Sequence, residues 1–229
     1  MKSDCTESQR ETILTLAIDG ASTVLDVGCG DGEKTFYLAQ HVQWLVGIDP
    51  DKNLIQTAKK KYCNSNLMFQ VAQAESLCFS DSSFVSVMFN ESLHHVPVDK
   101  QREALKESHR VLKPKGRLLI TEPIYCSGSL GQILELYNDE KNQKQSAIKA
   151  IKSVINSEFT LSEKKEILIE YHCKGFNDLY EFYVNSKPYT KWKKEKKQDI
   201  MDRLKKCNRT LEGDFVIDYF ASVWLLRKK

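Results

Sequence analysis

The sequence lacks the long uncharged run that a membrane-spanning helix needs, which is about 20 residues. Even the apolar stretch from Leu118 to Tyr137 is interrupted by Glu122 and Glu135. Residues 1–10 also lack the apolar core that secretory signals carry. We therefore expect no membrane span and, by default, a cytoplasmic protein.

Several other classes are excluded by features that the sequence does not have. Its seven cysteines are odd in number and form no Cys-x-x-Cys pair, so we expect neither a disulfide framework nor a metal site. There is no internal repeat and no linker rich in glycine, serine or proline. With 28% charged and 41% hydrophobic residues, the composition also excludes disordered and collagen-like chains. We expect a single domain over residues 1–229.

The net charge of +3 is unevenly distributed. Residues 1–139 carry 14 Lys/Arg and 18 Asp/Glu, whereas residues 140–229 carry 20 and 13, a net charge of +7. The second half is therefore compatible with an acidic substrate or with RNA. The sequence pI of about 8.3 nevertheless falls short of the value above about 9 that is typical of nucleic-acid-binding domains.

Short apolar runs alternate with helical patterns from Thr23 to Glu122, which predicts a parallel sheet covered by helices on both faces. The expected strands are residues 23–27, 44–48, 67–71, 84–89 and 117–121. The expected helices are residues 33–40, 52–62 and 99–112, the last of them ended by the Pro and Gly of residues 113–116.

The pattern changes after Glu122. We expect helices at residues 129–137 and 146–156, and two further strands at residues 166–171 and 221–226. The fold class is thus α/β, a Rossmann-like, doubly wound, seven-stranded and mostly parallel sheet with helices on both faces. A segment at residues 1–22 is expected to be helical, residues 23–126 to form a cofactor-binding core, and residues 127–220 a helical cover.

The turn after the first strand is rich in glycine. Gly28, Gly30 and Gly32 alternate with other residues, so that a ligand can lie directly on the backbone. Asp49 ends the second strand, where its carboxylate can accept both hydroxyls of an adenosine ribose. The alternative role of Asp49 is a helix N-cap. Together these residues predict a nucleoside-containing ligand.

The spacing of the glycines distinguishes between cofactors. Dinucleotide-binding enzymes use Gly-x-Gly-x-x-Gly, whereas here the third glycine comes one position early, at Gly32. Glu33 at the start of the following helix would repel a pyrophosphate. A cofactor with a ribose and a zwitterionic tail therefore fits better than a dinucleotide such as NAD.

Residues 23–122 resemble the class I S-adenosylmethionine-dependent methyltransferases. Within that class they resemble the small-molecule branch, which includes the ubiquinone/menaquinone-biosynthesis C-methyltransferases. The stretches that carry the resemblance are VLDVGCGDG (24–32), VGID (46–49), AESLCF (74–79), SLHHV (92–96) and RVLKPKGRLLI (110–120).

The resemblance implies S-adenosylmethionine as the cofactor and S-adenosylhomocysteine as its product. The residues that it assigns to the cofactor are Asp26, Gly28, Cys29 and Gly30 for the methionine portion, Asp49 for the ribose, Pro50, Gln73 and Ala74 for the adenine, and Asn90 for the sulfonium side. Gln73 departs from the family, which usually has Asp there. Its amide oxygen can still accept a hydrogen bond from the adenine amino group.

Four further residues follow strands four and five, at the edge where open α/β sheets bind ligands. His94 and His95 could supply a general base near neutral pH, which an acceptor hydroxyl, protonated amine or acidic carbon would need. The alternative is that one of them packs against the helix that follows. Glu122 and Tyr125 are candidate substrate contacts at the same edge.

Three functions remain open from the sequence. The first is methyl transfer to a small molecule. The second is methyl transfer to tRNA or protein, with the basic second half as a docking surface and residues 191–197 as its most basic run. The third is a catalytically silent methyltransferase-like binding domain. The absence of an added nucleic-acid module favours the first, and the oligomeric state is left undetermined.

Overall fold

The computed structural model describes residues 16, 18, 21–135, 140–174, 202–203, 205–206 and 215–229. Its contacts divide the chain into two compact units, each of which is considered by itself. The larger unit is formed by described residues within 11–122, 140–166 and 222–229, and the smaller unit by those within 123–139 and 167–221.

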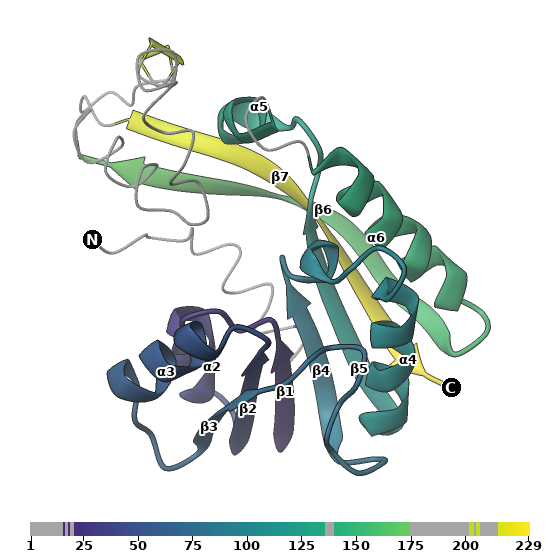
Figure 1. Ribbon diagram of the computed structural model, residues 1–229. Coiled ribbons are helices and arrows are strands. Elements are labelled where there is room, and N and C mark those ends of the chain that lie inside the picture. The colour runs from purple at the N-terminus through teal and green to yellow at the C-terminus, as the bar shows by residue number, and fades with distance from the viewer. Residues whose placement is uncertain are drawn as a thin grey trace. The chain divides into compact units, whose positions relative to one another are not determined.

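Seven strands form one sheet, in the order β3-β2-β1-β4-β5-β7-β6 (Figure 1). The strands are β1 (Thr23–Val27), β2 (Trp44–Asp49), β3 (Leu67–Val71), β4 (Phe84–Asn90), β5 (Leu112–Pro123), β6 (Phe159–Cys173) and β7 (Phe215–Lys228). The pairs β2·β3, β1·β2, β1·β4 and β4·β5 are parallel, and the C-terminal pair β6·β7 is antiparallel. The predicted α/β class with a seven-stranded, mostly parallel sheet is confirmed.

The chain order reverses between β1 and β4, so the carboxyl ends of these strands meet at a topological switch point, where open α/β sheets bind ligands. The described helices are α2 (Glu33–Ala39), α3 (Lys52–Lys61), the 3₁₀ helix η2 (Leu93–His95), α4 (Gln101–Val111), α5 (Gly128–Glu135) and α6 (Lys141–Val154). Helix α3 begins where the Asp51 carboxylate accepts hydrogen bonds from the backbone N–H groups of Asn53 and Leu54.

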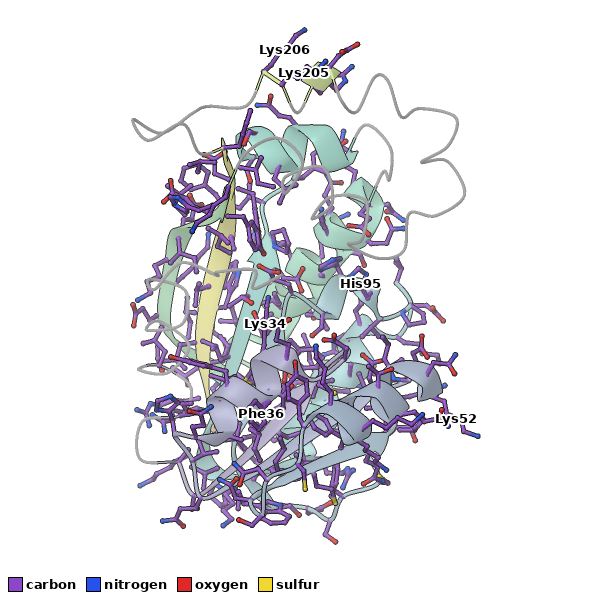
Figure 2. The ribbon with its side chains drawn as sticks, turned by 90° about the vertical axis from the view of Figure 1, so that its left-hand side faces the viewer. Lys34, Phe36, Lys52, His95, Lys205 and Lys206 are labelled. Atoms are coloured by element: carbon purple, nitrogen blue, oxygen red, sulfur yellow. The ribbon has the colours of Figure 1, made fainter. Side chains whose placement is uncertain are left out.

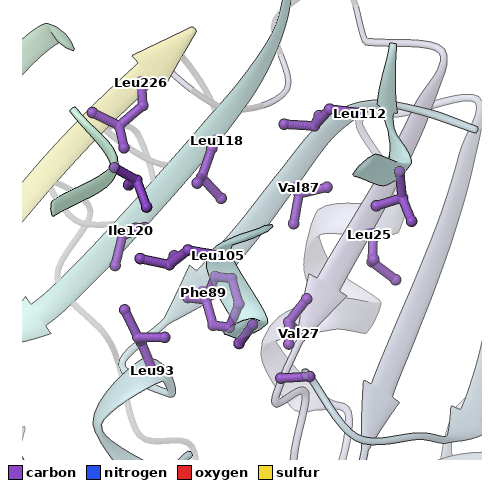
Figure 3. Packing of buried hydrophobic residues seen from close by; sticks show 14 of the residues in the cluster. Leu25, Val27, Val87, Phe89, Leu93, Leu105, Leu112, Leu118, Ile120 and Leu226 are labelled. Atoms are coloured by element: carbon purple, nitrogen blue, oxygen red, sulfur yellow. The ribbon is translucent and has the colours of Figure 1, made fainter. Parts of the chain in front are cut away.

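Side chains alternate between the two faces of the sheet. One face of β1, β4 and β5 packs against α4 and α6 in the main core, part of which is seen in Figure 3. Labelled members of this core are Leu25, Val27, Val87, Phe89, Leu93, Leu105, Leu112, Leu118, Ile120 and Leu226. On the other face Phe69 packs against Ile55 and Ala58 of α3. Covering both faces leaves the ends of the strands as the place for a ligand.

Several element boundaries differ from those expected. Strand β5 begins at Leu112 instead of 117, because Leu112 already pairs with Phe84 of β4; between Leu112 and Arg117 the register shifts, and Lys115 there has φ +62°. Helix α6 begins at Lys141 instead of 146. Strand β6 begins at Phe159 instead of 166, and its polar first half is tolerated because β6 is an edge strand.

Helix α5 of the smaller unit is tied to β7. The Asp218 carboxylate accepts hydrogen bonds from the backbone N–H and the hydroxyl of Ser129, at 2.8 and 2.7 Å. Gly128 has φ +61° and packs so closely on Asp218 that an added Cβ would lie 2.3 Å from its carbonyl oxygen. Only glycine therefore fits at this position.

Several predicted features fall outside the described residues. These are most of the segment 1–22 and, within the expected cover, residues 175–201, which include the basic run 191–197. The helical cover expected over residues 127–220 thus stays a prediction. Among the residues that are described, no helix is long and apolar enough to cross a membrane.

Candidate active site

A glycine turn follows β1 and folds back onto the end of β2. The backbone N–H groups of Gly28 and Cys29 donate to the carbonyl oxygen of Ile48, at 2.8 and 2.9 Å. Gly28 has φ +81°, and a Cβ there would lie 2.4 Å from the Cβ of Ser92, which follows β4. The turn therefore needs glycine at this position, both for its backbone conformation and for its contact with the β4 end.

Gly30 leaves the surface of the turn open. A Cβ added to it would meet no described atom within 4 Å. Its backbone N–H donates to Oδ2 of Asp49 at 3.0 Å, and the N–H of Asp51 donates to Oδ1 at 2.8 Å. The Asp49 carboxylate is thus held at the end of β2, with lone pairs remaining on both oxygens to accept from a ligand.

A pocket of about 560 Å³ lies above this turn, entirely within the larger unit. The residues that line it are Val27, Gly28, Gly30, Asp49, Pro50, Leu54, Ala72, Gln73, Ala74, Glu75, Glu91, Ser92, His95, Val96 and Pro97. It therefore brings together seven of the residues predicted from the sequence: Gly28, Gly30, Asp49, Pro50, Gln73, Ala74 and His95. Of these, His95 extends from η2 after β4, and Figure 2 labels it together with Lys34 of α2.

Asp26 lies at the carboxyl end of β1 and is buried rather than part of the pocket wall. Its Oδ2 accepts a hydrogen bond from the Thr35 hydroxyl at 2.7 Å. Within the described part of the chain, Oδ1 has no hydrogen-bond partner. Burial raises the pKa of Asp26 to about 6, although the Thr35 hydrogen bond opposes the shift. The carboxylate is therefore a costly buried anion that a nearby cation would stabilise.

Two other predicted cofactor residues also lie outside the pocket lining. Cys29 is partly buried in the glycine turn, and burial raises the pKa of its thiol, which therefore stays protonated. Asn90 ends β4, where its Oδ1 accepts a hydrogen bond from the Thr121 hydroxyl at 2.8 Å. Of the two predicted substrate contacts, Glu122 is not part of the pocket lining but binds His94, as described below. Tyr125 belongs to the smaller unit.

His94 is buried and bound to Glu122. Its Nδ1 lies 2.6 Å from Oε2 of Glu122, and its backbone N–H donates to Oε1 at 3.2 Å. Burial alone lowers the pKa of His94, but the charge and hydrogen bond of Glu122 outweigh it, so the pKa lies above its ordinary value. The pair is therefore an imidazolium held by a carboxylate at slightly acid pH.

His95 differs from its neighbour. Its ring is partly exposed in the pocket, and its centroid lies 4.0 Å from that of His94. Loss of surrounding water, and then the charge of His94, lower the pKa of His95 to about 4. His95 is thus neutral at physiological pH and has a ring nitrogen that can accept a proton.

Glu140, just before α6, completes this group. Its Oε2 lies 3.9 Å from Nε2 of His94 and 3.3 Å from the Lys144 ammonium. His94, His95 and Glu140 have ligand-type atoms within 4.8 Å of one another. Because Lys144 already pairs with Glu140, a divalent ion bound by Glu140 would have to displace the Lys144 ammonium. The expectation of no metal site stays a prediction.

The sequence reasoning missed several pocket residues. Glu91, Ser92, Val96 and Pro97 come from the same segment after β4 as the two histidines, so the position of that segment at the sheet edge could have indicated them. Glu140 had no such signal. It approaches His94 only because α6 packs against η2, and Glu140 and His94 are 46 residues apart in the sequence.

The sheet order, the glycine turn and the acidic end of β2 over residues 23–122 resemble those of the class I S-adenosylmethionine-dependent methyltransferases. Residues 25–120 match the family model described as a methyltransferase domain. The chain is 34% identical over 102 residues to the uncharacterized methyltransferase YcgJ of Bacillus subtilis, a match that covers 43% of this chain and 40% of that protein. It is 32% identical over 118 residues to a demethylmenaquinone methyltransferase of Staphylococcus epidermidis, covering 50% and 48%.

Solved structures agree on the fold. The crystal structure of YcgJ has a TM-score of 0.65 at 20% identity and covers 98% of this chain and 99% of that one. The N-methyltransferase NodS of Bradyrhizobium japonicum, in complex with S-adenosyl-L-homocysteine, has a TM-score of 0.58 at 14% identity, covering 96% and 86%. The chain spans less than half the length of the two curated relatives above. The family resemblance and the fold class are confirmed, and the cofactor that the resemblance implies is S-adenosylmethionine.

The residues present fit this cofactor in three respects. The surface of Gly30 is open, so a ligand can contact the backbone of the turn. Asp49 offers carboxylate oxygens that are held at the pocket wall. Asp26 has a buried oxygen without a described partner, which suits the ammonium group of a methionine tail.

Proposed function

We propose that this protein is an S-adenosylmethionine-dependent methyltransferase that acts on a small-molecule acceptor. The observation that carries the proposal is that Gly30, Asp49 and His95 line the same pocket. It supports the proposal because Asp49, a candidate acceptor for ribose hydroxyls, and the His95 imidazole line the same pocket at one edge of the sheet. The relatives named as methyltransferases support the same reading.

The chain's own residues divide the cofactor between them. Asp49 would accept from the ribose hydroxyls, Gln73 and Ala74 would contact the edge of the adenine, and Pro50 would lie beside its ring. Gly28 to Gly30, with Asp26 and Asn90, would hold the methionine and sulfonium portions. When bound, the cofactor supplies a methyl group on a sulfonium, which is already a strong electrophile. Holding the acceptor in line with that methyl group is therefore the main task of the pocket.

His95 is the residue proposed to take a proton from the acceptor. It lines the pocket and is neutral at physiological pH, so its free ring nitrogen can accept a proton as the acceptor reacts. His94 is buried beside it and held by Glu122. Its role would be to fix the position of η2 and to set the electrostatic environment of His95.

Labelled methyl transfer tests the proposal. The protein is incubated with methyl-labelled S-adenosylmethionine and metabolite extracts, and small-molecule and macromolecular fractions are counted separately. We expect label in a small molecule, and its loss in Asp49→Ala. Label in RNA or protein instead would favour the docking-surface alternative. Cofactor binding without any transfer, across extracts and macromolecules, would favour the silent binding domain.

A further inference from the structure

Arg110, in the last turn of α4, uses all five of its N–H donors on one short segment and its own helix. Nη1 donates to the carbonyl oxygen of Phe79 at 2.7 Å and to Oδ1 of Asp81 at 2.9 Å. Nη2 donates to the carbonyl oxygen of Leu77 at 2.8 Å and to Oε2 of Glu107 at 2.8 Å. Nε donates to Oε1 of Glu107 at 2.8 Å. A guanidinium has five donors, so none is left over.

Glu107 binds the same segment, residues 77–81, through its side chain. Its Oε2 accepts a hydrogen bond from the backbone N–H of Leu77 at 2.9 Å. Both the N–H and the carbonyl oxygen of Leu77 are thus bound by side chains of α4. The Arg110 hydrogen bonds lower the pKa of Glu107, so its carboxylate stays charged at any pH near neutral. We call Arg110 and Glu107 together the α4 clamp.

The clamped segment continues directly from the pocket wall. Gln73, Ala74 and Glu75 line the pocket, and Leu77 follows two residues later. The stretch between is a tight turn, because the N–H of Ser76 donates to the carbonyl oxygen of Gln73 at 3.3 Å. At its other end, the N–H of Ala72 donates to the carbonyl oxygen of Asp49 at 3.2 Å. The wall is therefore held between Asp49 and the α4 clamp.

We propose that Arg110, with Glu107, is a positioning residue for the adenine end of the cofactor pocket, acting through the backbone of residues 73–77. This rests on the proposed function, since it takes the nucleoside of the cofactor as the ligand of that wall. The clamp itself does not line the pocket. It sets where Gln73 and Ala74 stand relative to Asp49, and thereby how well one ligand can contact the wall and Asp49 together.

Lysine cannot replace arginine in this role. The clamp requires a planar group that reaches two carbonyl oxygens and two carboxylates at once, whereas an ammonium offers three donors from a single point. Arg110→Lys keeps the positive charge at the end of α4 on a slightly shorter side chain. It should nevertheless lose the paired contacts to Leu77 and Phe79.

The test is the Kd of S-adenosylhomocysteine, measured by calorimetry on the full chain. We expect Arg110→Lys to raise the Kd by about tenfold, the equivalent of about 1.4 kcal/mol. The matched control is Arg102→Lys, on the same helix, because Arg102 contacts Ser153 and Glu158 instead of the pocket segment. That control should stay within about twofold of wild type.

A double-mutant cycle with Gln73→Ala separates positioning from general destabilisation. If the clamp acts through the wall, the loss from Arg110→Lys should be smaller in the Gln73→Ala background. Glu107→Gln, which keeps one acceptor for Leu77, should give a smaller loss and serves as the second variant if Arg110→Lys does not fold. With an acceptor in hand, KM for S-adenosylmethionine should rise while kcat at saturation stays unchanged.

The measurements distinguish a failure of the clamp proposal from a failure of the proposed function. Wild-type affinity in folded Arg110→Lys and Glu107→Gln would overturn the clamp and leave the proposed function standing. Fully additive losses in the cycle would likewise overturn it, since Arg110 would then act elsewhere. If wild-type protein itself binds no S-adenosylhomocysteine, the proposed function fails, and the clamp proposal fails with it.

Discussion

The Nδ1 atom of His94 lies 2.6 Å from Oε2 of Glu122, and both side chains are buried at the carboxyl ends of neighbouring strands. The carboxylate holds one ring nitrogen of His94, so the other is directed towards Glu140. The imidazole therefore lies between two acidic groups, while its neighbour His95 faces the pocket. This asymmetry assigns different tasks to two adjacent histidines.

Glu122→Gln should lower the pKa of His94 and destabilise the protein in a pH-dependent way. A histidine whose folded pKa is raised contributes stability below its unfolded pKa of about 6.5, and that stability is lost as pH rises through the folded value. The loss in free energy of unfolding should therefore be about 1.5–3 kcal/mol near pH 6 and shrink at higher pH. Denaturant titrations and NMR titration of His94 measure both effects.

Glu103→Gln is the control, because Glu103 is exposed on α4 and pairs with Lys106 at 3.6 Å. It should change stability by less than about 1 kcal/mol. An unshifted pKa of His94 in Glu122→Gln would contradict the account of the pair.

His95→Ala should slow methyl transfer by about 10²–10⁴-fold if His95 takes the proton from the acceptor. Because the pKa of His95 is lowered to about 4, its contribution should be constant from about pH 6 upward and fall only as pH approaches 4. Single-turnover rates against pH test this directly. A rate that instead rises with pH above 6.5 would identify His94, whose pKa is raised, as the base.

Asp26 predicts a pH dependence of cofactor binding. Its ionised form suits an ammonium group, so the affinity for S-adenosylhomocysteine should strengthen as pH rises through about 6. Asp26→Asn should remove this dependence and weaken binding at pH 7.5 by about 1.5–3 kcal/mol. Calorimetry at several pH values is the measurement, with the exposed Asp99 changed to Asn as the control.

Asp26→Asn should also stabilise the unliganded protein. Because the folded pKa of about 6 lies above the ordinary 3.8, the folded state binds its proton more tightly, and stability falls as pH rises between these values. Above pH 6 the full cost of the buried anion remains, so Asp26→Asn should raise the free energy of unfolding at pH 7. A fall in stability together with unchanged, pH-dependent binding would contradict this role.

Gln73 should contribute to binding through its amide oxygen. Gln73→Asp should keep or strengthen the affinity for S-adenosylhomocysteine, since a carboxylate also accepts from the adenine amino group. Gln73→Leu should weaken it by about 1–3 kcal/mol, because the amino group loses its partner. Equal affinities of the two variants would show that Gln73 points away from the ligand.

The sequence predicted the first four strands to within one residue of their ends, because each is a short apolar run bounded by turns. It also predicted the glycine turn and Asp49. The turn is a run of neighbouring residues directly after β1, and Asp49 is the last residue of β2. The sequence did not predict the start of β5 at Leu112, because Pro114 and Gly116 suggest a break before the strand; the structure has a register shift there, but Leu112 before it already pairs with Phe84 of β4.

Contacts between distant segments were the part that could not be predicted. The sequence predicted both His94 and Glu122 at the sheet edge, but the hydrogen bond between them depends on how β4 and β5 are paired. The Glu140 contact depends on how α6 packs against η2, and the α4 clamp depends on how α4 packs against residues 77–81; a single sequence does not say which segments meet. The described structure supplies those relationships.

The most direct test of the central claim is calorimetric titration with S-adenosylmethionine, S-adenosylhomocysteine and NAD, on wild type and Asp49→Ala. We predict binding of the first two ligands, no binding of NAD, and a loss of about 1.5–3 kcal/mol in Asp49→Ala. Binding of NAD without binding of S-adenosylhomocysteine would contradict the assignment of this pocket to a methyl donor.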